Sequence, residues 1–232
     1  MKQTIYISCL FALFLTTNAC KNNRERPGGY QSGDVSTNSA KKKGELDDLV
    51  ADYESKERLV WQKPEMVIKR LGNLSTKTVV DLGAGTGFFA FRVVGQAKKT
   101  IALDIDRRFI AFMDSAKQEL PPDLRSRFEA RLVETNDAKL KKGEADAVII
   151  VNTYMFISDR VAYMQRLRQG IAKGGIVLIV DYKEKNIPVG PPVSAKVPLS
   201  VVEKELRQAG FNSINADDTS LDYQYIITAV NN

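Results

Sequence analysis

The sequence contains no histidine and only two cysteines, Cys9 and Cys20, among its 232 residues. Without histidine, neither a Ser-His-Asp triad nor a Cys-His pair can activate a nucleophile. A zinc site would need four carboxylates or cysteines, and the cysteines are too few, so we expect no metal site. The sequence therefore excludes the hydrolase mechanisms that depend on histidine or zinc.

The amino terminus lacks an apolar run long enough to cross a membrane. The mostly apolar stretch Ile5–Leu15 has 11 residues, whereas a bilayer-spanning helix needs about 20. Lys2 precedes this stretch, and small or polar residues follow it up to Ala19. A positive start, a short apolar core and a small-residue end are typical of a signal peptide, so we expect residues 1–20 to direct export.

The segment that ends at Cys20 resembles a bacterial lipoprotein signal, with Thr17 where such signals usually carry leucine. The resemblance implies that Cys20 is lipidated, becomes the first mature residue and anchors the protein to a membrane of the cell envelope, on its periplasmic side or surface. Cys9 would leave with the leader. A plain cleaved signal, or a buried helix with a chance cysteine, remains the alternative.

Residues 21–43 are rich in Gly, Ser, Asn and Lys and poor in apolar residues, so we expect a flexible tether before a domain at 44–232. The chain carries 34 Lys and Arg against 28 Asp and Glu, and residues 1–43 hold 7 of the basic and 2 of the acidic residues. The net charge of +6 is thus +5 in the leader and tether and +1 in the domain. The basic excess suits export and a membrane surface, and it gives no indication of a nucleic-acid partner.

Short apolar runs alternate with segments of helical period from Gly44 onward. Continuous β-branched runs are typical of parallel strands covered on both faces. We expect an α/β fold: a Rossmann-like, doubly wound, mostly parallel sheet of about seven strands between two helical layers, ending in an antiparallel hairpin. The expected strands are 78–82, 100–104, 128–133, 147–151, 176–181, 211–216 and 223–230. The expected helices are one or two over 47–71, broken near Pro64, and 88–94, 109–120, 160–171 and 200–209, with Gly174-Gly175 ending the segment before a strand.

The strongest chemical signal is VVDLGAGTGFF at 79–89, a glycine loop between a buried strand and a helix. Glycines 83, 85 and 87 allow positive φ and a close approach of ligand to backbone. The spacing is GxGxG, and Phe88 stands where a dinucleotide-binding loop would require glycine. Asp81 stands two residues before the first glycine of the loop.

This loop resembles motif I of the class I S-adenosylmethionine-dependent methyltransferases, and segments 61–72, 159–183, 189–211 and 222–230 resemble one subgroup of that family. The resemblance implies S-adenosylmethionine as cofactor. It implies that Asp104 binds the ribose, that Asn136 or Asp137 contacts the adenine, and that Asn152 lies near the methionine moiety and the methyl acceptor. The alternative for Asp104 is a helix N-cap before Arg107. The expected cofactor-binding residues are Asp81, Gly83, Ala84, Gly85, Gly87, Asp104, Ile105, Asn136, Asp137 and Asn152.

The sequence departs from its subgroup after the fourth strand, where a TYHHI-like segment reads Thr153-Tyr154-Met155-Phe156-Ile157. Methyl transfer does not require histidine, because an enzyme can work by aligning donor and acceptor and excluding water. Tyr154, Asp181 and Lys183 lie at or just after strand ends and are the candidate catalytic residues. Each also has a structural interpretation. The Pro-rich segment 188–198 is either a lid beside the acceptor or an ordinary connection.

We therefore predict a methyltransferase that acts on a small-molecule acceptor. The competing hypothesis is a membrane-anchored lipoprotein that keeps the fold as a binding or structural module and has lost transfer. Methylation of nucleic acid is disfavoured, because the NTYM segment at 152–155 lacks the proline-aromatic motif of amino-methylating enzymes and no RNA-binding appendage is present.

The lipid anchor predicts a simple experiment. A Cys20→Ser variant cannot carry the lipid, so cell fractionation should find it released from the membranes that hold the wild-type protein. If the variant stays membrane-bound, the lipidation of Cys20 is wrong.

Overall fold

The computed structural model describes residues 39–232, with side chains from residue 46 onward. The predicted signal peptide, Cys20 and most of the tether lie outside these residues. Within the described part, no helix has both the length and the apolar character required to cross a membrane.

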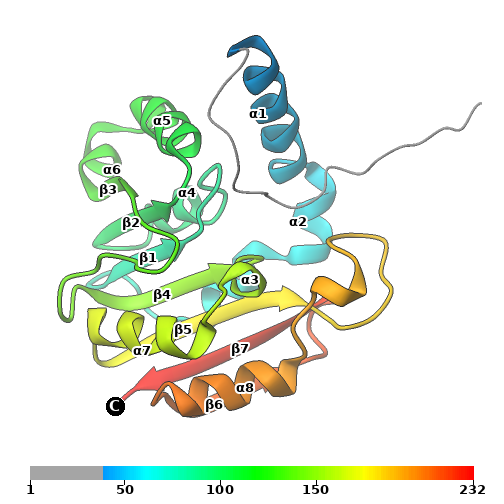
Figure 1. The fold of residues 1–232 in the computed structure, drawn as a ribbon. Coiled ribbons are helices and arrows are strands. Elements are labelled where there is room, and N and C mark those ends of the chain that lie inside the picture. Colours follow the sequence, from blue (N-terminus) through cyan, green and yellow to red (C-terminus); the bar gives the residue numbers. More distant parts are fainter. Residues whose placement is uncertain (1–38) are drawn as a thin grey trace, which may run out of the picture. The chain divides into compact units, whose positions relative to one another are not determined.

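The domain is built on one seven-stranded sheet with the order β3-β2-β1-β4-β5-β7-β6 (Figure 1). Neighbouring strands from β3 to β5 are parallel, and β7 runs antiparallel to both β5 and β6. The predicted mostly parallel sheet with a terminal antiparallel hairpin is confirmed. The strands are β1 (Thr78–Leu82), β2 (Lys99–Asp104), β3 (Phe128–Leu132), β4 (Ala145–Val151), β5 (Ile171–Tyr182), β6 (Asn212–Asp217) and β7 (Gln224–Asn231).

Helices cover both faces of the sheet, which explains why the central strands are apolar on both sides. Val80 and Ile150 face a core formed with α7 (Arg160–Gly170) and α8 (Leu199–Gln208). Val79 and Ile149, one residue away in their strands, face the opposite core, which includes side chains of α3 (Pro64–Lys69) and α4 (Ala90–Val93). The helix α5 (Arg107–Ala116) packs beside α4 through Met113. The sheet therefore lies between two helical layers, as predicted.

The described residues before β1, from residue 39 onward, form three helices where one or two were expected: α1 (Ser39–Tyr53), α2 (Lys56–Gln62) and α3. Lys63, with φ +47°, separates α2 from α3, and Pro64 begins α3 because the first turn of a helix needs no proline N–H. The helix α1 begins at Ser39, so residues 39–43 are helical although we assigned them to the tether.

Two other features differ from the prediction. The glycine pair Gly174-Gly175 lies inside β5, where the register against β4 shifts, because a bulge accommodates glycine without ending the strand. The helix α6 (Pro122–Arg127) was missed, since six residues are too few to show a helical period. Three short 3-10 turns complete the fold: η1 (Lys117–Glu119), η2 (Tyr154–Phe156) and η3 (Val193–Ala195).

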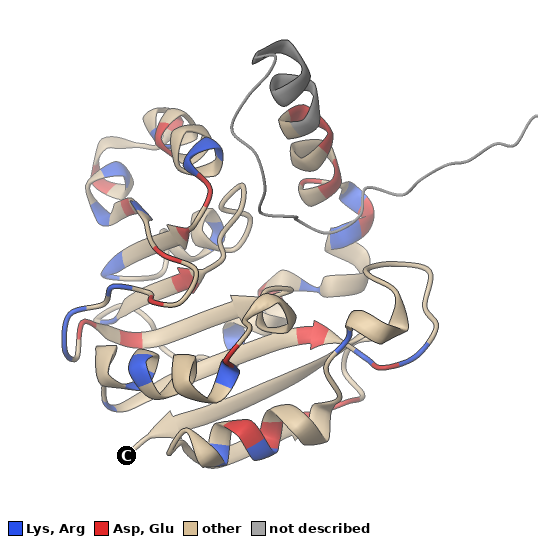
Figure 2. Ribbon diagram, viewed as in Figure 1, with Lys and Arg blue, Asp and Glu red and all other residues tan. Residues whose placement is uncertain are grey.

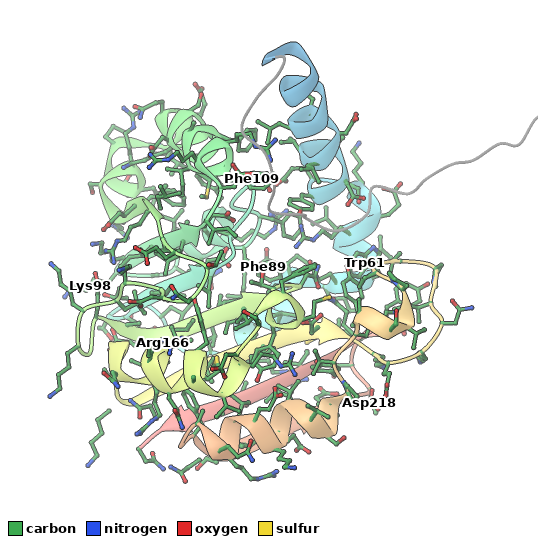
Figure 3. All side chains as sticks on the ribbon, viewed as in Figure 1. Trp61, Phe89, Lys98, Phe109, Arg166 and Asp218 are labelled. Carbon is green, nitrogen blue, oxygen red and sulfur yellow. The ribbon has the colours of Figure 1, made fainter. Side chains whose placement is uncertain are left out.

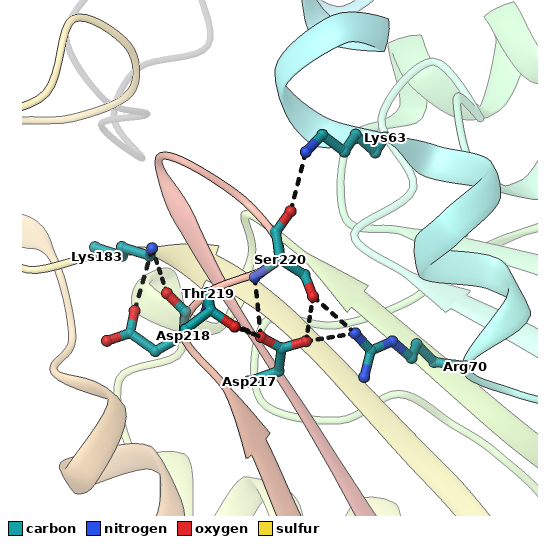
Figure 4. A network of polar contacts seen from close by, with 7 residues as sticks. All are labelled: Lys63, Arg70, Lys183, Asp217, Asp218, Thr219 and Ser220. Atoms are coloured by element: carbon teal, nitrogen blue, oxygen red, sulfur yellow. Dashed lines mark hydrogen bonds and ion pairs between the residues drawn. The ribbon is translucent and has the colours of Figure 1, made fainter.

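The turn between β6 and β7 is tied to α3 by a polar network (Figure 4). Asp217 accepts hydrogen bonds from the backbone N–H groups of Thr219 (2.9 Å) and Ser220 (3.0 Å), and it pairs with Arg70. The Ser220 hydroxyl also donates a hydrogen bond to Asp217, and this bond, together with the two backbone bonds, holds the pKa of Asp217 well below its usual value. Lys63 donates to the carbonyl of Ser220 at 3.1 Å. The network fixes the helices before β1 against the end of the chain.

Candidate functional site

The strand order reverses between β1 and β4, and in open α/β sheets ligands bind outside the carboxyl ends of the strands at such a point. The loops that follow β1 and β4 touch there. A Cβ at Gly83 would lie 2.4 Å from Oγ1 of Thr153, which is closer than atoms can pack. The sequence-predicted glycine loop and the segment after the fourth strand therefore line one site.

The glycine loop has the conformation that its sequence predicts. Gly83, Gly85 and Gly87 have φ of +74°, +56° and +85°. The N–H groups of Gly83 and Ala84 both donate to the carbonyl of Leu103 in β2, at 2.8 and 2.9 Å. The loop is thus bound to the neighbouring strand through its backbone, in a conformation that favours glycine at these three positions.

Asp104 holds the same loop through its side chain. One carboxylate oxygen accepts the N–H of Gly85 at 2.8 Å, and the other accepts the N–H of Asp106 at 2.9 Å. Burial raises the pKa of Asp104, and these two bonds act against the rise. The N-cap of α5 is Asp106, which accepts the N–H of Arg108 at 2.8 Å, so Asp104 is not the helix cap. The ribose role of Asp104 stays a prediction.

Asp81 is a buried carboxylate, 3% exposed, at the base of the loop. It accepts the N–H of Ala90, the first residue of α4, at 2.9 Å. Burial raises the pKa of Asp81 to about 7, although that bond and the nearby Arg58 guanidinium lower it. A carboxyl group with this pKa changes its ionisation near neutral pH, and an added positive charge beside it would favour the carboxylate.

The helices before β1 contribute side chains that the sequence did not reveal as part of the site. Glu54 accepts a hydrogen bond from the hydroxyl of Thr86 at 2.5 Å. The ring of Tyr53 stacks on Phe109 of α5, with ring centroids 5.7 Å apart, and lies 3.1 Å from where a Cβ at Gly85 would be. Phe109 is labelled in Figure 3. The guanidinium of Arg58 lies 4.1 Å from the centroid of the Phe88 ring. Residues 53–58 therefore pack directly on the glycine loop.

A chain of polar side chains connects α2 with the ends of β4 and β7. Arg58 donates to Gln62 at 2.6 Å, Gln62 donates to Gln224 at 3.0 Å, and Gln224 donates to Asn152. Asn152 has φ +55°, a left-handed conformation that asparagine tolerates better than most residues. Gln62 is buried, and its partner Gln224 lies 162 residues further along the chain, so the sequence offered no signal for this connection.

Asn136 and Asp137 lie in a turn after β3. The carbonyl of Asn136 accepts a hydrogen bond from the guanidinium of Arg166, with 2.8 Å between the carbonyl oxygen and Nη2. The Asp137 carboxylate accepts the N–H of Lys139 at 2.8 Å. These contacts shape the turn and leave the predicted adenine contact untested. Ile105, which follows Asp104, is 45% exposed and offers an apolar surface at the loop.

Among the described residues, no hydrogen bond or ion pair joins the side chains of the three candidate catalytic residues to one another. The Tyr154 hydroxyl donates to Glu205 of α8 at 2.8 Å, and burial raises the pKa of this tyrosine. Lys183 pairs with Asp218, in the turn after β6, at 3.2 Å. Both residues therefore have structural partners.

Asp181 is the third candidate, and it holds η2. Its carboxylate accepts the N–H of Met155 at 3.2 Å and of Tyr182 at 2.8 Å, while burial raises its pKa to about 7. Asp181 is only 1% exposed. Its contacts make it a residue that positions Met155 and the turn around it.

Among the described residues, no three Cys, Asp or Glu side chains come close enough together to hold a metal ion.

A glycine loop and two buried acidic residues at the ends of β1 and β2, on a Rossmann-like sheet, define an α/β domain that binds a nucleoside-containing ligand. Residues 73–227 match the model of the methyltransferase domain family, and the chain belongs to this family. The family predicted from the glycine loop and the later segments is confirmed.

Two curated relatives are distant in sequence. The chain is 24% identical over 197 residues to a tRNA U34 carboxymethyltransferase of Actinobacillus succinogenes, a match covering 78% of this chain and 59% of the relative. It is 24% identical over 148 residues to a demethylmenaquinone methyltransferase of Lactococcus lactis subsp. lactis, covering 62% and 57%. The chain thus spans less than two thirds of the length of these relatives.

Solved structures share the fold. A SAM-dependent methyltransferase from Aquifex aeolicus superposes with a TM-score of 0.71 at 20% identity, over 80% of this chain and 96% of that one. A phosphoethanolamine N-methyltransferase 2 of Haemonchus contortus, in complex with phosphomonomethylethanolamine and S-adenosylhomocysteine, gives a TM-score of 0.60 at 16% identity, over 73% and 52%. These likenesses confirm the predicted architecture.

The contact between Gly83 and Thr153 yields a matched pair of variants. Gly72 has φ +72° with no atom within 4 Å of an added Cβ, so Gly72→Ala measures the backbone strain alone, about 1–2 kcal/mol. Gly83→Ala has the same strain plus a clash, so chemical denaturation should give an unfolding free energy about 1–3 kcal/mol lower still. Adding Thr153→Ala should recover part of that difference. Equal losses in the two single variants would mean that the loops after β1 and β4 do not pack as described.

Proposed function

We propose that this protein is an S-adenosylmethionine-dependent methyltransferase that acts on a small-molecule acceptor. The observation that carries the proposal is the pair of buried carboxylates at the glycine loop, Asp81 and Asp104. Neither is neutralised by an ion pair among the residues described, and burial raises the pKa of both. Such a site favours a ligand that brings positive charge and hydroxyl donors.

The described residues fit S-adenosylmethionine. Asp81 would face its cationic methionine end, directly or through water. Asp104 would accept hydrogen bonds from the ribose hydroxyls. These bonds would either replace its bond to the Gly85 N–H or share the carboxylate oxygens with it. The exposed side chain of Ile105 would contact the face of the adenine ring. Asn136 or Asp137 would contact the edge of the ring. Tyr53, Glu54 and Arg58 pack on the same loop and would cover the bound cofactor.

The bound cofactor supplies a methyl group on a positively charged sulfur, which is already activated for displacement. The protein's contribution is then to align an acceptor atom with that methyl group and to exclude water. Asn152 and Thr153, at the end of β4, lie next to the loop and would line the path of transfer. The turn η2, held by Asp181, would place Met155 and Phe156 beside the acceptor.

Charge supports a small acceptor. Residues 44–232 have a net charge of +1, and Figure 2 shows basic and acidic residues interspersed over the domain. A nucleic-acid substrate would call for a basic face. The competing hypothesis, an anchored module without activity, receives no support from the glycine loop, whose three glycines and two acidic residues are all in place.

We further propose that residues 1–20 direct export and that lipid on Cys20 anchors the domain. The sequence pattern alone supports this location. An exported enzyme would need a supply of S-adenosylmethionine outside the cytosol.

The pKa of Asp81 gives a test by calorimetric titration with S-adenosylmethionine. With a pKa of about 7, the free carboxyl group is mostly protonated at pH 5.5 and half ionised at pH 7.0. The amino group of the ligand stays mostly protonated over this range, since its ordinary pKa is near 8. Affinity should therefore rise about tenfold from pH 5.5 to 7.0.

In Asp81→Asn the rise should be lost and the affinity at pH 7.0 should fall at least tenfold. The control is Asp114→Asn, an exposed carboxylate on α5, which should behave as wild type. No binding of S-adenosylmethionine to the folded wild-type protein would contradict the proposed function. Binding that is independent of pH and of Asp81 would contradict the role of this residue.

A further inference from the structure

A cavity lies beside the turn η2. The cavity has a volume of about 380 Å³ and is lined by Met155, Phe156 and Arg160, by residues 194–198, and by Val201 of α8. Met155 and Phe156 follow β4, and Lys196 lies beside Tyr182, the last residue of β5. The cavity therefore opens beyond the carboxyl ends of β4 and β5, where open α/β sheets bind ligands. Its volume falls in the range of small-molecule sites.

Most of the cavity wall is apolar. Met155, Val197, Pro198 and Val201 contribute hydrophobic surface, and the Phe156 ring is 62% exposed although it is large and apolar. An exposed aromatic side chain on the wall of a cavity is a favourable surface for an apolar ligand. The occupant thus needs an apolar body.

The charges on the wall are not balanced. Glu205 neutralises Arg160 through two hydrogen bonds of 2.8 Å, and it also accepts the Tyr154 hydroxyl. Lys196 has no such partner. No carboxylate among the described residues forms an ion pair with it, and its ammonium donates to the backbone carbonyl of Lys185, at 2.8 Å from Nζ.

Lys196 is nevertheless buried, with 7% of its surface exposed. Burial lowers the pKa of this ammonium, and no neighbouring carboxylate acts against the change. The Tyr182 ring, whose centroid is 6.0 Å from Nζ, gives only a weak cation–π contact. The Lys196 ammonium is partly withdrawn from water and has no carboxylate partner, so an anion that binds beside it would be favoured.

We propose that this cavity binds the methyl acceptor and that the acceptor is a small monocarboxylate with an apolar body, whose carboxylate pairs with Lys196. That the ligand is the methyl acceptor rests on the proposed function. That the ligand is an apolar monocarboxylate rests on the cavity alone. A single unpaired cation suits a single negative charge, because Arg160 is already neutralised. The apolar body would lie against Phe156 and Val201. The segment 194–198, which contains Lys196, then recognises the negative charge of the ligand.

The test compares carboxylic acids with their primary amides, which share size and shape but carry no charge. The probes are 3-phenylpropionate, indole-3-acetate and octanoate, each against its amide, with binding to the purified full-length protein followed by ligand-detected NMR. We expect at least one acid to bind about tenfold or more tightly than its amide. If no acid binds, or if acids and amides bind equally, the proposal is wrong, whatever the variants do.

Variants locate the preference. Lys196→Met should bring the affinity for the acid down to that of the amide, while Lys196→Arg should keep the preference. Lys204→Gln, which removes an exposed lysine from α8, is the matched control and should leave the preference unchanged. A preference that survives in a folded Lys196→Met protein would place the anion elsewhere and overturn the assignment.

A titration with S-adenosylmethionine in the same samples separates the two proposals. Cofactor binding without a preference for the acids contradicts the inference about the cavity, and it supports the proposed methyltransferase function. An acid preference without cofactor binding supports the carboxylate site and contradicts the proposed enzyme.

Discussion

The site depends on the attachment of the glycine loop to β2. The carboxylate of Asp104 accepts the N–H of Gly85, and the carbonyl of Leu103 accepts two further N–H groups of the loop. These bonds hold a loop whose three glycines have positive φ, and the first of them, Gly83, lies against Thr153. Because a backbone that is already fixed loses little entropy on binding, the loop is preorganised for its ligand. Asp81 extends the arrangement to the start of α4.

The helices before β1 complete this site from above the strand ends. Tyr53, Glu54 and Arg58 contact the loop, and Gln62 continues through Gln224 to Asn152. The network around Asp217 holds α3 against the turn between β6 and β7. The glycine loop, the helices that pack on it and the cavity beside η2 are therefore formed by different parts of the chain, and the hydrogen bonds of Gln224 with Gln62 and Asn152 connect α2 with the end of β4.

The sequence was sufficient for the sheet and the loop, and insufficient for the side chains that cover them. Apolar runs such as 78–82 mark buried strands, since both faces of a parallel strand are covered. The glycine spacing and Asp81 act within a few residues, so their local geometry follows from sequence. Gln62 and Gln224, by contrast, are 162 residues apart, and no local pattern indicates that they meet. For the same reason Tyr154 could be named a candidate although its hydroxyl bonds to Glu205 on a distant helix.

The proposed function assigns the preorganised loop to methyl transfer. The most direct measurement is the transfer of a radiolabelled methyl group from S-adenosylmethionine, catalysed by the purified protein, into a whole-cell extract that contains metabolites, membranes, protein and RNA. We expect label in a small-molecule fraction, and loss of that label with Asp104→Asn. Label confined to protein or RNA, or no label with a protein that binds S-adenosylmethionine, would contradict the proposed function.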